Sequence, residues 1–204
     1  MVLLKQKNSP TISIKIWFKT GSQNDPNWKE GLAYLTSKLI SEGSTTKLKY
    51  QEILERLYPM ATTYKCSAGT EMTVCAGRVH KDNFDEYYKL FMEAILFPAF
   101  NEKDFGRIKD ETINYLENSL RYSDDEELAK AVLYNSIYKN TPYGHIERGS
   151  VSSIKEITIT DVEDFYKKNY NKNNYVLGVA GSFNNKILKK LKKDLEKLHD
   201  GNEV

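Results

Sequence analysis

Histidine is a common catalytic and metal-binding residue, and the sequence contains three: His80, His145 and His199. A zinc site on a helix needs two ligands three or four residues apart, because that spacing puts both on one face. None of the three histidines has a second His or Cys at that spacing. A metal site built from them would depend on tertiary contacts alone. We therefore expect surface or packing histidines.

Nucleophilic and phosphate-binding motifs are also missing from the sequence. No G-x-S-x-G is present to expose a serine on a sharp turn. Neither G-x-x-x-x-G-K-[ST] nor a G-x-G-x-x-G between a strand and a helix is present to hold phosphate. The sequence therefore predicts neither a serine hydrolase nor a nucleotide-binding protein.

The two cysteines, Cys66 and Cys75, flank a predicted turn at Gly69 and Thr70. The β-rich runs on either side, residues 61–68 and 71–79, predict a hairpin. A hairpin could place the two thiols diagonally on one face, so a bridge is an open alternative. We expect two reduced, packed thiols, and the redox compartment stays open.

Acidic residues form two groups in the middle of the chain. Glu111 and Glu117 lie six residues apart on a helix predicted over 102–121, so they do not share a face. Residues 124–127 are all acidic and open the next helix, where they complement the helix dipole. Neither group by itself predicts a metal site.

Residues 184–198 are basic and predict an amphipathic helix. An apolar stripe runs along one side and lysines cover the other. Such a helix could bind an anionic membrane, an acidic partner or nucleic acid. Because acids interrupt the run and no aromatic residue lies in the stripe, we expect an ordinary packed surface helix.

These residues must be positioned by an alternation of strands and helices. Strands are predicted over 11–18, 61–68, 71–79 and 174–181. Helices are predicted over 29–42, 50–60, 83–96, 102–121, 125–138, 161–169 and 184–198, with Thr160 and Glu163 as a capping box. We expect one α+β domain, a mainly antiparallel sheet with helices packed on one face.

Length and charge exclude several classes of protein. The chain has 204 residues, enough for one ordinary domain, and we expect 1–204 to be a single unit. A net charge of +2 provides no global basic field for nucleic acid. No run approaches the roughly 18 apolar residues that a membrane span needs. We therefore expect no nucleic-acid partner and no membrane span.

Several segments, taken in order, resemble the insulinase/pitrilysin family of zinc metallopeptidases. KTGSQNDPNWKEGLAYLTSKLISEG is similar to the family's strand, Gly-Ser turn and catalytic helix. LFPAFNEKDFGRIKDETINYLENSLRYSDDEELAKAVL is similar to the paired helices that carry its third zinc ligand. NTPYGHIERGSVSSIKEITITDVEDFYKKNYNKNNYVLGVAGSF resembles its P-Y-G stretch and closing strand. The resemblance implies the half-domain architecture of processing peptidases, within the N-terminal lobe of a longer protein.

The sequence departs from this family at the catalytic helix. The H-x-x-E-H motif places two zinc-binding histidines at i and i+4, and its Glu activates the metal-bound water. Those positions hold Tyr34, Ser37 and Lys38. Glu117 aligns on or near the third ligand, as a vestigial position. The resemblance therefore implies a non-catalytic homologue that has lost the zinc of its active relatives, and we expect no cofactor.

The family's architecture then implies a role in partnership. Inactive domains of the family support catalytic ones, so the expected partner is a second insulinase-like domain on the same or another chain. An extended peptide could also pair with an exposed sheet edge. We expect that edge in the hairpin, at Tyr64, Cys66, Thr73 and Cys75.

Two alternatives remain open at this point. One is an active zinc peptidase with an altered or shared site, built from His80, Glu111 and Glu117. The other is a stand-alone module that binds through the basic helix over 184–198. The compartment is unknown from the residues; the resemblance implies a periplasmic or otherwise exported protein if the source is bacterial.

Overall fold

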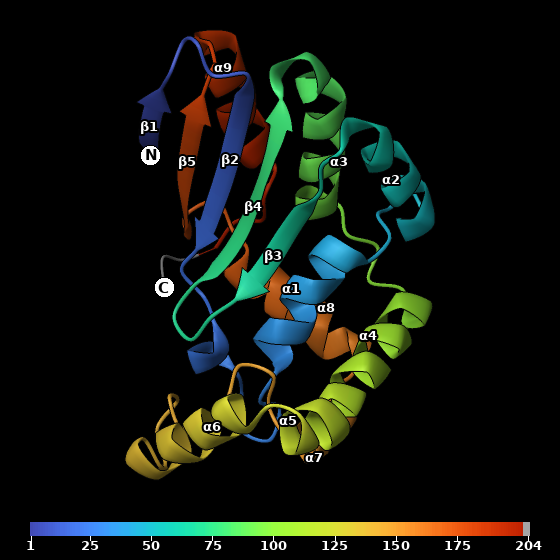
Figure 1. The fold of residues 1–204 in the computed structure, drawn as a ribbon, viewed down its shortest axis with the longest axis vertical. Helices are drawn as coiled ribbons and strands as arrows, with labels where there is room; N and C mark the ends of the chain where they lie inside the picture. Colours follow the sequence, from blue (N-terminus) through green and yellow to red (C-terminus); the bar gives the residue numbers. More distant parts are fainter. Residues whose placement is uncertain (202–204) are drawn as a thin grey trace.

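A computed structural model describes residues 1–201 of the chain, and a five-stranded sheet forms its centre (Figure 1). The strands are β1 Val2–Lys5, β2 Thr11–Phe18, β3 Tyr64–Ala68, β4 Thr73–His80 and β5 Tyr175–Gly181. Their order is β1-β5-β2-β4-β3, and only β1 and β5 run parallel. The mainly antiparallel sheet is therefore confirmed.

The helices follow the predicted order with two additions. They are α1 Leu32–Glu42, α2 Tyr50–Leu57, α3 Phe84–Leu96, α4 Glu102–Asn114, α5 Leu120–Tyr122, α6 Asp125–Ile137, α7 Val151–Glu156, α8 Ile159–Asn169 and α9 Asn185–Leu195. Short 3₁₀ turns cover Ser22–Asn24, Tyr58–Met60 and Lys81–Asn83. A π turn, Tyr115–Ser119, joins α4 to α5. No helix among residues 1–201 is long and apolar enough to cross a membrane.

The helices cover one face of the sheet. In β2, side chains alternate along the strand: Ile12, Ile14, Ile16 and Phe18 are buried, while Lys15 on the opposite face is exposed. This period of two is what a sheet with one packed face requires. The buried face joins α1, α3, α8 and α9 in a single core. The α+β class with helices on one face is confirmed.

Close packing in this core depends on one glycine of β4. A Cβ at Gly77 would lie 1.5 Å from the Tyr87 hydroxyl oxygen. That hydroxyl crosses the strand to donate a hydrogen bond to the Thr63 carbonyl at 3.3 Å. Glycine at this position therefore lets α3 approach the sheet directly.

The cysteine prediction is wrong. Cys66 and Cys75 form a disulfide, with 4.0 Å between their Cα atoms. The hairpin register pairs the two residues directly across the strands, not diagonally as expected. Cross-strand partners have adjacent Cβ atoms, so the two thiols meet. Both side chains are buried beneath the helical layer.

One predicted boundary differs from the structure, and two short elements were not predicted. Helix α8 begins at Ile159, and its capping box is Thr158 with Asp161 rather than Thr160 with Glu163. Strand β1 was not predicted because all four of its residues are exposed, which leaves no alternation. Helix α7 was not predicted either, since only six residues follow its Ser150 N-cap.

Candidate functional site

Helix α1 places Tyr34, Ser37 and Lys38 at the sheet edge. Buried Leu32, Leu35, Leu39 and Ile40 recur at helical spacing. They fix the helix against β3, α4 and α8. The side of α1 that carries Tyr34 and Lys38 stays half-buried and faces β3 and the loop before α7.

The start of α1 depends on a distant carboxylate. Its N-cap residue, Gly31, has φ 100° and no side chain to cap the helix. Asp25 replaces that cap, because its carboxylate accepts the Gly31 N–H at 2.7 Å and the Ala33 N–H at 2.8 Å. Burial raises the pKa of Asp25 by more than the two N–H donors lower it, and the resulting pKa is about 7.

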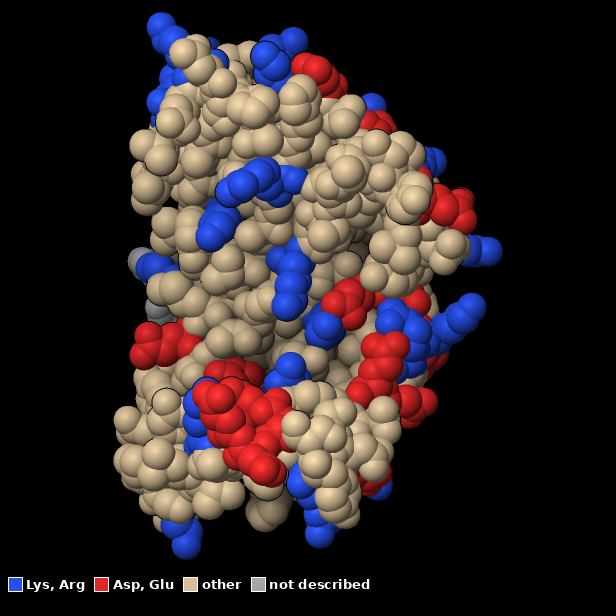
Figure 2. Space-filling model, viewed as in Figure 1, with Lys and Arg blue, Asp and Glu red and all other residues tan. Residues whose placement is uncertain are grey.

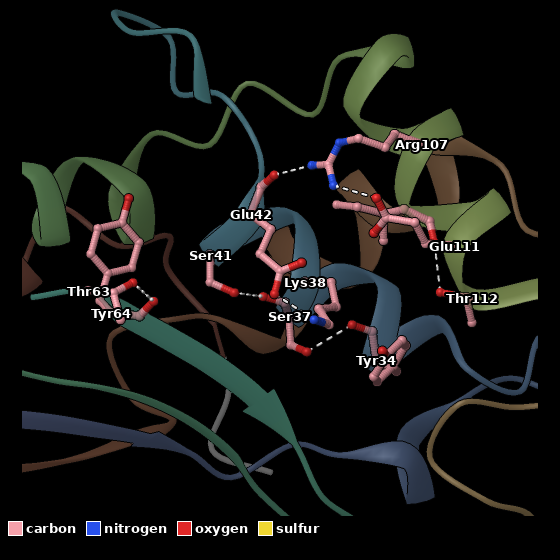
Figure 3. A network of polar contacts seen from close by, with 11 residues as sticks. Tyr34, Ser37, Lys38, Ser41, Glu42, Thr63, Tyr64, Arg107, Glu111 and Thr112 are labelled. Atoms are coloured by element: carbon pink, nitrogen blue, oxygen red, sulfur yellow. Dashed lines mark hydrogen bonds and ion pairs between the residues drawn. The ribbon is translucent and has the colours of Figure 1, made fainter. Parts of the chain in front are cut away.

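Lys38 occupies the second ligand position of the resembled motif, and it is neutralised within its own helix. Its Nζ lies 2.5 Å from Glu42 Oε1, one turn further along (Figure 3). The Glu42 carbonyl in turn accepts a hydrogen bond from Arg107 of α4, which also pairs with Glu111 at 3.1 Å. A network of side chains therefore holds the ammonium in place.

Ser37 and Tyr34 are also engaged within the protein. The Ser37 hydroxyl donates to the Tyr34 carbonyl at 2.8 Å, and Ser37 is only 1% exposed (Figure 3). The Tyr34 ring lies 5.3 Å from the guanidinium carbon of Arg148. The guanidinium carbon of Arg148 also lies 4.1 Å from the centre of the Tyr115 ring, in the π turn. The three predicted positions thus share one site with Arg148.

These residues line a hollow of about 190 Å³ between α1 and β3. Tyr34, Ser37 and Lys38 form its α1 side, Lys65 and Ser67 its β3 side, and Arg148 closes it from the loop before α7. In the space-filling view, basic side chains cross the middle of this face and acidic side chains gather directly below them (Figure 2). Glu147 also lines it, and Lys38 is paired with Glu42, so the site is a small pocket of mixed charge.

The pocket does not suit zinc. Protein ligands of zinc are thiolates, imidazoles and carboxylates. Here a phenol stacks on a cation, a buried serine is committed to the backbone, and a paired ammonium carries positive charge. Neither a phenol nor an ammonium belongs to the usual set of zinc ligands. The donor set therefore does not fit the metal.

The other candidate ligands lie apart. Glu117 is exposed, in the π turn, and makes no side-chain hydrogen bond or ion pair within residues 1–201. Glu111 pairs with Arg107, and His80 lies at the end of β4, next to Asp82. No three His, Cys, Asp or Glu residues in the described part of the chain could hold a metal ion together.

Peptide binding at the hairpin stays a prediction, and the sheet order shows which of its two strands lies at an edge. Strand β3 is an edge strand with one paired neighbour, but β4 lies between β2 and β3. Thr73 and Cys75 of β4 are therefore not at an edge, because strands pair with β4 on both sides. Tyr64 and Cys66 belong to the edge strand, and their side chains are buried. Lys65 and Ser67, which alternate with them along the strand, are exposed.

The basic helix α9 packs as an ordinary surface helix. Leu191 and Leu195 are fully buried, and the lysines of its other side are exposed. Asp194 accepts a hydrogen bond from the Tyr88 hydroxyl at 2.7 Å, and Lys190 lies 4.2 Å from the Tyr88 ring centre. The apolar stripe is therefore part of the core and is not available to a membrane.

Helix α6 is different, since none of its residues is buried. Val132, Leu133 and Ile137 are 59%, 55% and 60% exposed, and Tyr134 is 52% exposed. Figure 1 shows α6 at the lower end of the molecule, away from the sheet. A wide hollow of about 960 Å³ separates part of α6 from the loop that carries Trp28. Leu128 of α6 packs against the core, but these four apolar side chains stay exposed within the described chain.

Three residues that shape the site were not identified from the sequence. Arg148 and Tyr115 come from segments far from α1, and no local pattern links them. Asp25 left one signal: a helix that opens on Gly31 lacks the usual Ser, Thr, Asp or Asn cap. Such a gap implies that a more distant group satisfies the first N–H donors.

The chain matches one family model and is similar to several known proteins. The profile of the insulinase family, peptidase family M16, matches residues 1–149. An uncharacterized zinc protease of Rickettsia felis is 25% identical over 84% of the chain, and the non-peptidase homolog YmxG of Helicobacter pylori is 26% identical over 89%. A mitochondrial-processing peptidase subunit beta of Dictyostelium discoideum is 21% identical over 92%.

A solved structure has the same fold. The inactive domain of a peptidase M16 from Pseudomonas fluorescens superposes with a TM-score of 0.89 over 99% of the chain, at 23% identity. The chain spans 49% of that solved chain. It spans 41%, 41% and 39% of the three curated relatives, in the order given. The chain thus corresponds to about half of a typical relative.

Proposed function

The chain belongs to the insulinase family, peptidase family M16, and we propose that it is a non-catalytic half-domain that acts as partner to a catalytic one. The catalytic half-domain would lie on the same chain or on another subunit. In this role the domain stabilises its partner and offers the edge of β3 to an extended peptide.

One observation carries the proposal. The face of α1 that holds H-x-x-E-H in active relatives carries Tyr34, Ser37 and Lys38, and Lys38 is held by Glu42 at 2.5 Å. A fixed ammonium in a ligand position repels a divalent cation. A separate carboxylate, Glu117, is exposed, and it belongs to no group of three metal-binding side chains within residues 1–201.

Helix α6 supports the partner role. Soluble monomers rarely expose contiguous apolar surface of this kind unless it binds something. The three exposed aliphatic residues, Val132, Leu133 and Ile137, belong to one helix with no buried side. Because the chain corresponds to about half of the Pseudomonas fluorescens chain, a second half-domain is the occupant we propose.

The test measures association with a catalytic half-domain that keeps H-x-x-E-H, taken from the same source and purified separately. Sedimentation velocity should show a one-to-one complex. Leu133→Glu with Ile137→Glu should weaken the complex at least tenfold, since both side chains are already exposed and the change adds charge to the contact. Lys186→Glu in α9, an exposed position away from α6, is the matched control.

The outcomes of this test are distinct. A complex that survives the α6 changes intact would remove α6 from the interface. Failure of every such half-domain to bind, on the same or a separate chain, would overturn the partner role.

The compartment is part of the proposal. The Cys66–Cys75 disulfide supports an oxidising location, such as the periplasm or another exported site. Fractionation of the source cells, followed by thiol labelling without reductant, tests it. Labelled, cytosolic protein would contradict the export proposal.

A further inference from the structure

Helix α9 carries a lysine face whose charge is not paired within the described chain. Asp194 of α9 is bound by Lys197 at 2.6 Å, and the only other acid of residues 184–197 is the exposed Glu196. Four lysines of the helix are exposed and make no ion pair within residues 1–201: Lys186, Lys189, Lys192 and Lys193. The α9 lysine face, defined by these four residues, therefore presents an excess of positive charge.

This charge does not serve the packing of the helix. Leu191 and Leu195 are fully buried and attach α9 to the core. Lys189 lies one helical turn from Lys186 and from Lys193, and like charges at these spacings destabilise a helix. Exposed lysines that repel one another without an internal partner indicate an anionic partner outside the described chain.

Strand β1 lies beside the beginning of α9. The Ser182 hydroxyl, three residues before α9, donates to the Lys7 carbonyl, which follows β1, at 3.3 Å. The Gln6 N–H donates to the Gly181 carbonyl at 2.9 Å. Strand β1 is also the outermost strand at its end of the sheet (Figure 1). The end of β1 and the beginning of α9 therefore belong to one continuous surface.

Strand β1 adds apolar side chains to this surface. Val2, Leu3 and Leu4 are 64%, 42% and 67% exposed. Leu3 pairs in parallel register with Val179 of β5, which is buried under the helices. Partners in such a register point to the same face of the sheet, so Leu3 and, two residues on, Lys5 point to the helical side. An aliphatic and a cationic side chain thus share one face at the margin of the molecule.

A flat anionic surface fits this combination. Neither of the hollows described above is lined by β1 or α9, and a bilayer needs no cavity of matching shape. Each lysine near an anionic bilayer contributes about a fivefold gain in binding. Aliphatic side chains beside the lysines enter the boundary between head groups and acyl chains. Nucleic acid would account for the lysines but not for Leu3, because it offers phosphates without an apolar layer next to them.

We propose that the α9 lysine face, with Leu3 and Lys5 of β1, is a peripheral docking surface for an anionic lipid bilayer. The lysines contact the head groups, and Leu3 enters shallowly between them. The inference goes beyond the proposed function and does not rest on it, because α6, the surface proposed for the catalytic half-domain, is a different element.

The experiment measures co-sedimentation of the full chain with vesicles. One set of vesicles contains phosphatidylcholine alone, and the other contains about three parts of phosphatidylglycerol to seven of phosphatidylcholine. We expect binding to the anionic vesicles only. Binding should weaken at least ~10-fold as salt rises from about 0.05 M to about 0.5 M, since salt screens the lysines.

Neutral variants of the α9 lysine face test its role. Lys189→Gln, Lys192→Gln and Lys193→Gln together should weaken binding about 100-fold, because three contributions of about fivefold multiply. The matched control changes the net charge equally through three exposed lysines of other segments that make no ion pair within residues 1–201. It combines Lys49→Gln, Lys103→Gln and Lys139→Gln, and it should weaken binding less than about threefold.

A second variant tests the apolar part of the surface. Leu3→Ser should weaken binding about fivefold, because less apolar area leaves water. Leu54→Ser on α2 is the control, since Leu54 is 39% exposed and lies on another element, and it should bind as the natural chain does. Thermal melts establish that every variant is folded.

The contrary results are specific. Equal binding to both kinds of vesicle, or a lysine variant that binds as well as its control, would overturn the inference. Unchanged binding of Leu3→Ser would also overturn it, because the surface would then attract any polyanion. Duplex DNA of mixed sequence and polyglutamate serve as competing probes. Tighter binding of either than of anionic vesicles, at equal anionic charge, would assign the surface to nucleic acid or to an acidic protein instead.

Discussion

A few side chains decide what this domain can do. Ser37 and Lys38 lie on the side of α1 that carries Tyr34 because they follow it by three and four residues, and this placement could be predicted from spacing alone. The side chains that contact these residues could not be predicted from the sequence. Glu42 holds Lys38 at 2.5 Å, and Arg148 reaches Tyr34 from over a hundred residues away, so only tertiary packing reveals the pocket that Tyr34, Lys38 and Arg148 share.

Asp25 gives the domain a dependence on pH. Burial raises its pKa from 3.8 to about 7, so the folded chain keeps a proton that the unfolded chain has lost. Its contribution to stability is complete below about pH 4 and is lost as pH rises to 7. Each tenfold change in acidity constant is worth about 1.4 kcal/mol, so the loss is of order 4 kcal/mol.

Asp25→Asn tests this dependence. The variant should lower stability at acid pH, because one oxygen must replace two as acceptors for the start of α1, and should flatten the fall between pH 4 and 7. Urea unfolding at several pH values measures both effects. Asp82→Asn, at an exposed carboxylate, is the control. A variant with the same pH slope as the natural chain would show that Asp25 is not the group responsible.

At the scale of elements, hydrophobic periodicity predicted most of the order of helices and strands. Periodicity did not predict β1, whose residues are all exposed and do not alternate, or α7, which is too short to show a helical repeat. It also joined α4 and α5 into one helix, because the π turn Tyr115–Ser119 keeps residues facing the core on both sides. That turn places Tyr115 against Arg148, so the missed irregularity belongs to the site.

The β3–β4 hairpin should depend on its disulfide. Its residues are nine apart, and closing a loop of that length stabilises a fold by about 2–3 kcal/mol in the chain-entropy view. Cys66→Ser with Cys75→Ser leaves buried hydroxyls in an apolar environment, so Cys66→Ala with Cys75→Ala is the better comparison. Both pairs should lower the melting temperature, the Ser pair more.

The same hairpin borders the pocket through Lys65 and Ser67. Reduction of the natural chain should therefore lower its melting temperature in calorimetry by a similar amount to the Ala pair. Unchanged melting after complete reduction, checked by thiol titration, would show that the bridge contributes nothing to stability.

At the scale of the whole molecule, the chain spans about half the length of the relatives it matches. Its sheet buries one face under helices, and its lower end carries α6 with no buried residue. The sequence predicted the fold class from strand order and from the family resemblance. It did not predict the exposed α6, because a helical span by itself does not show which neighbours cover the helix.

The central claim is that the chain is a member of the insulinase family without a catalytic zinc site. The most direct test is calorimetric titration of the folded chain with Zn²⁺, with peptidase activity measured on the same samples. Tyr34→His with Lys38→His is the comparison, because it returns two imidazoles at i and i+4 and should gain zinc affinity.

We predict no stoichiometric zinc and no peptidase activity in the natural chain, since a phenol, a buried serine hydroxyl and an ammonium stand where the two zinc ligands and the catalytic carboxylate would lie. One bound zinc per natural chain, with peptidase activity that disappears in Glu117→Gln, would contradict the account.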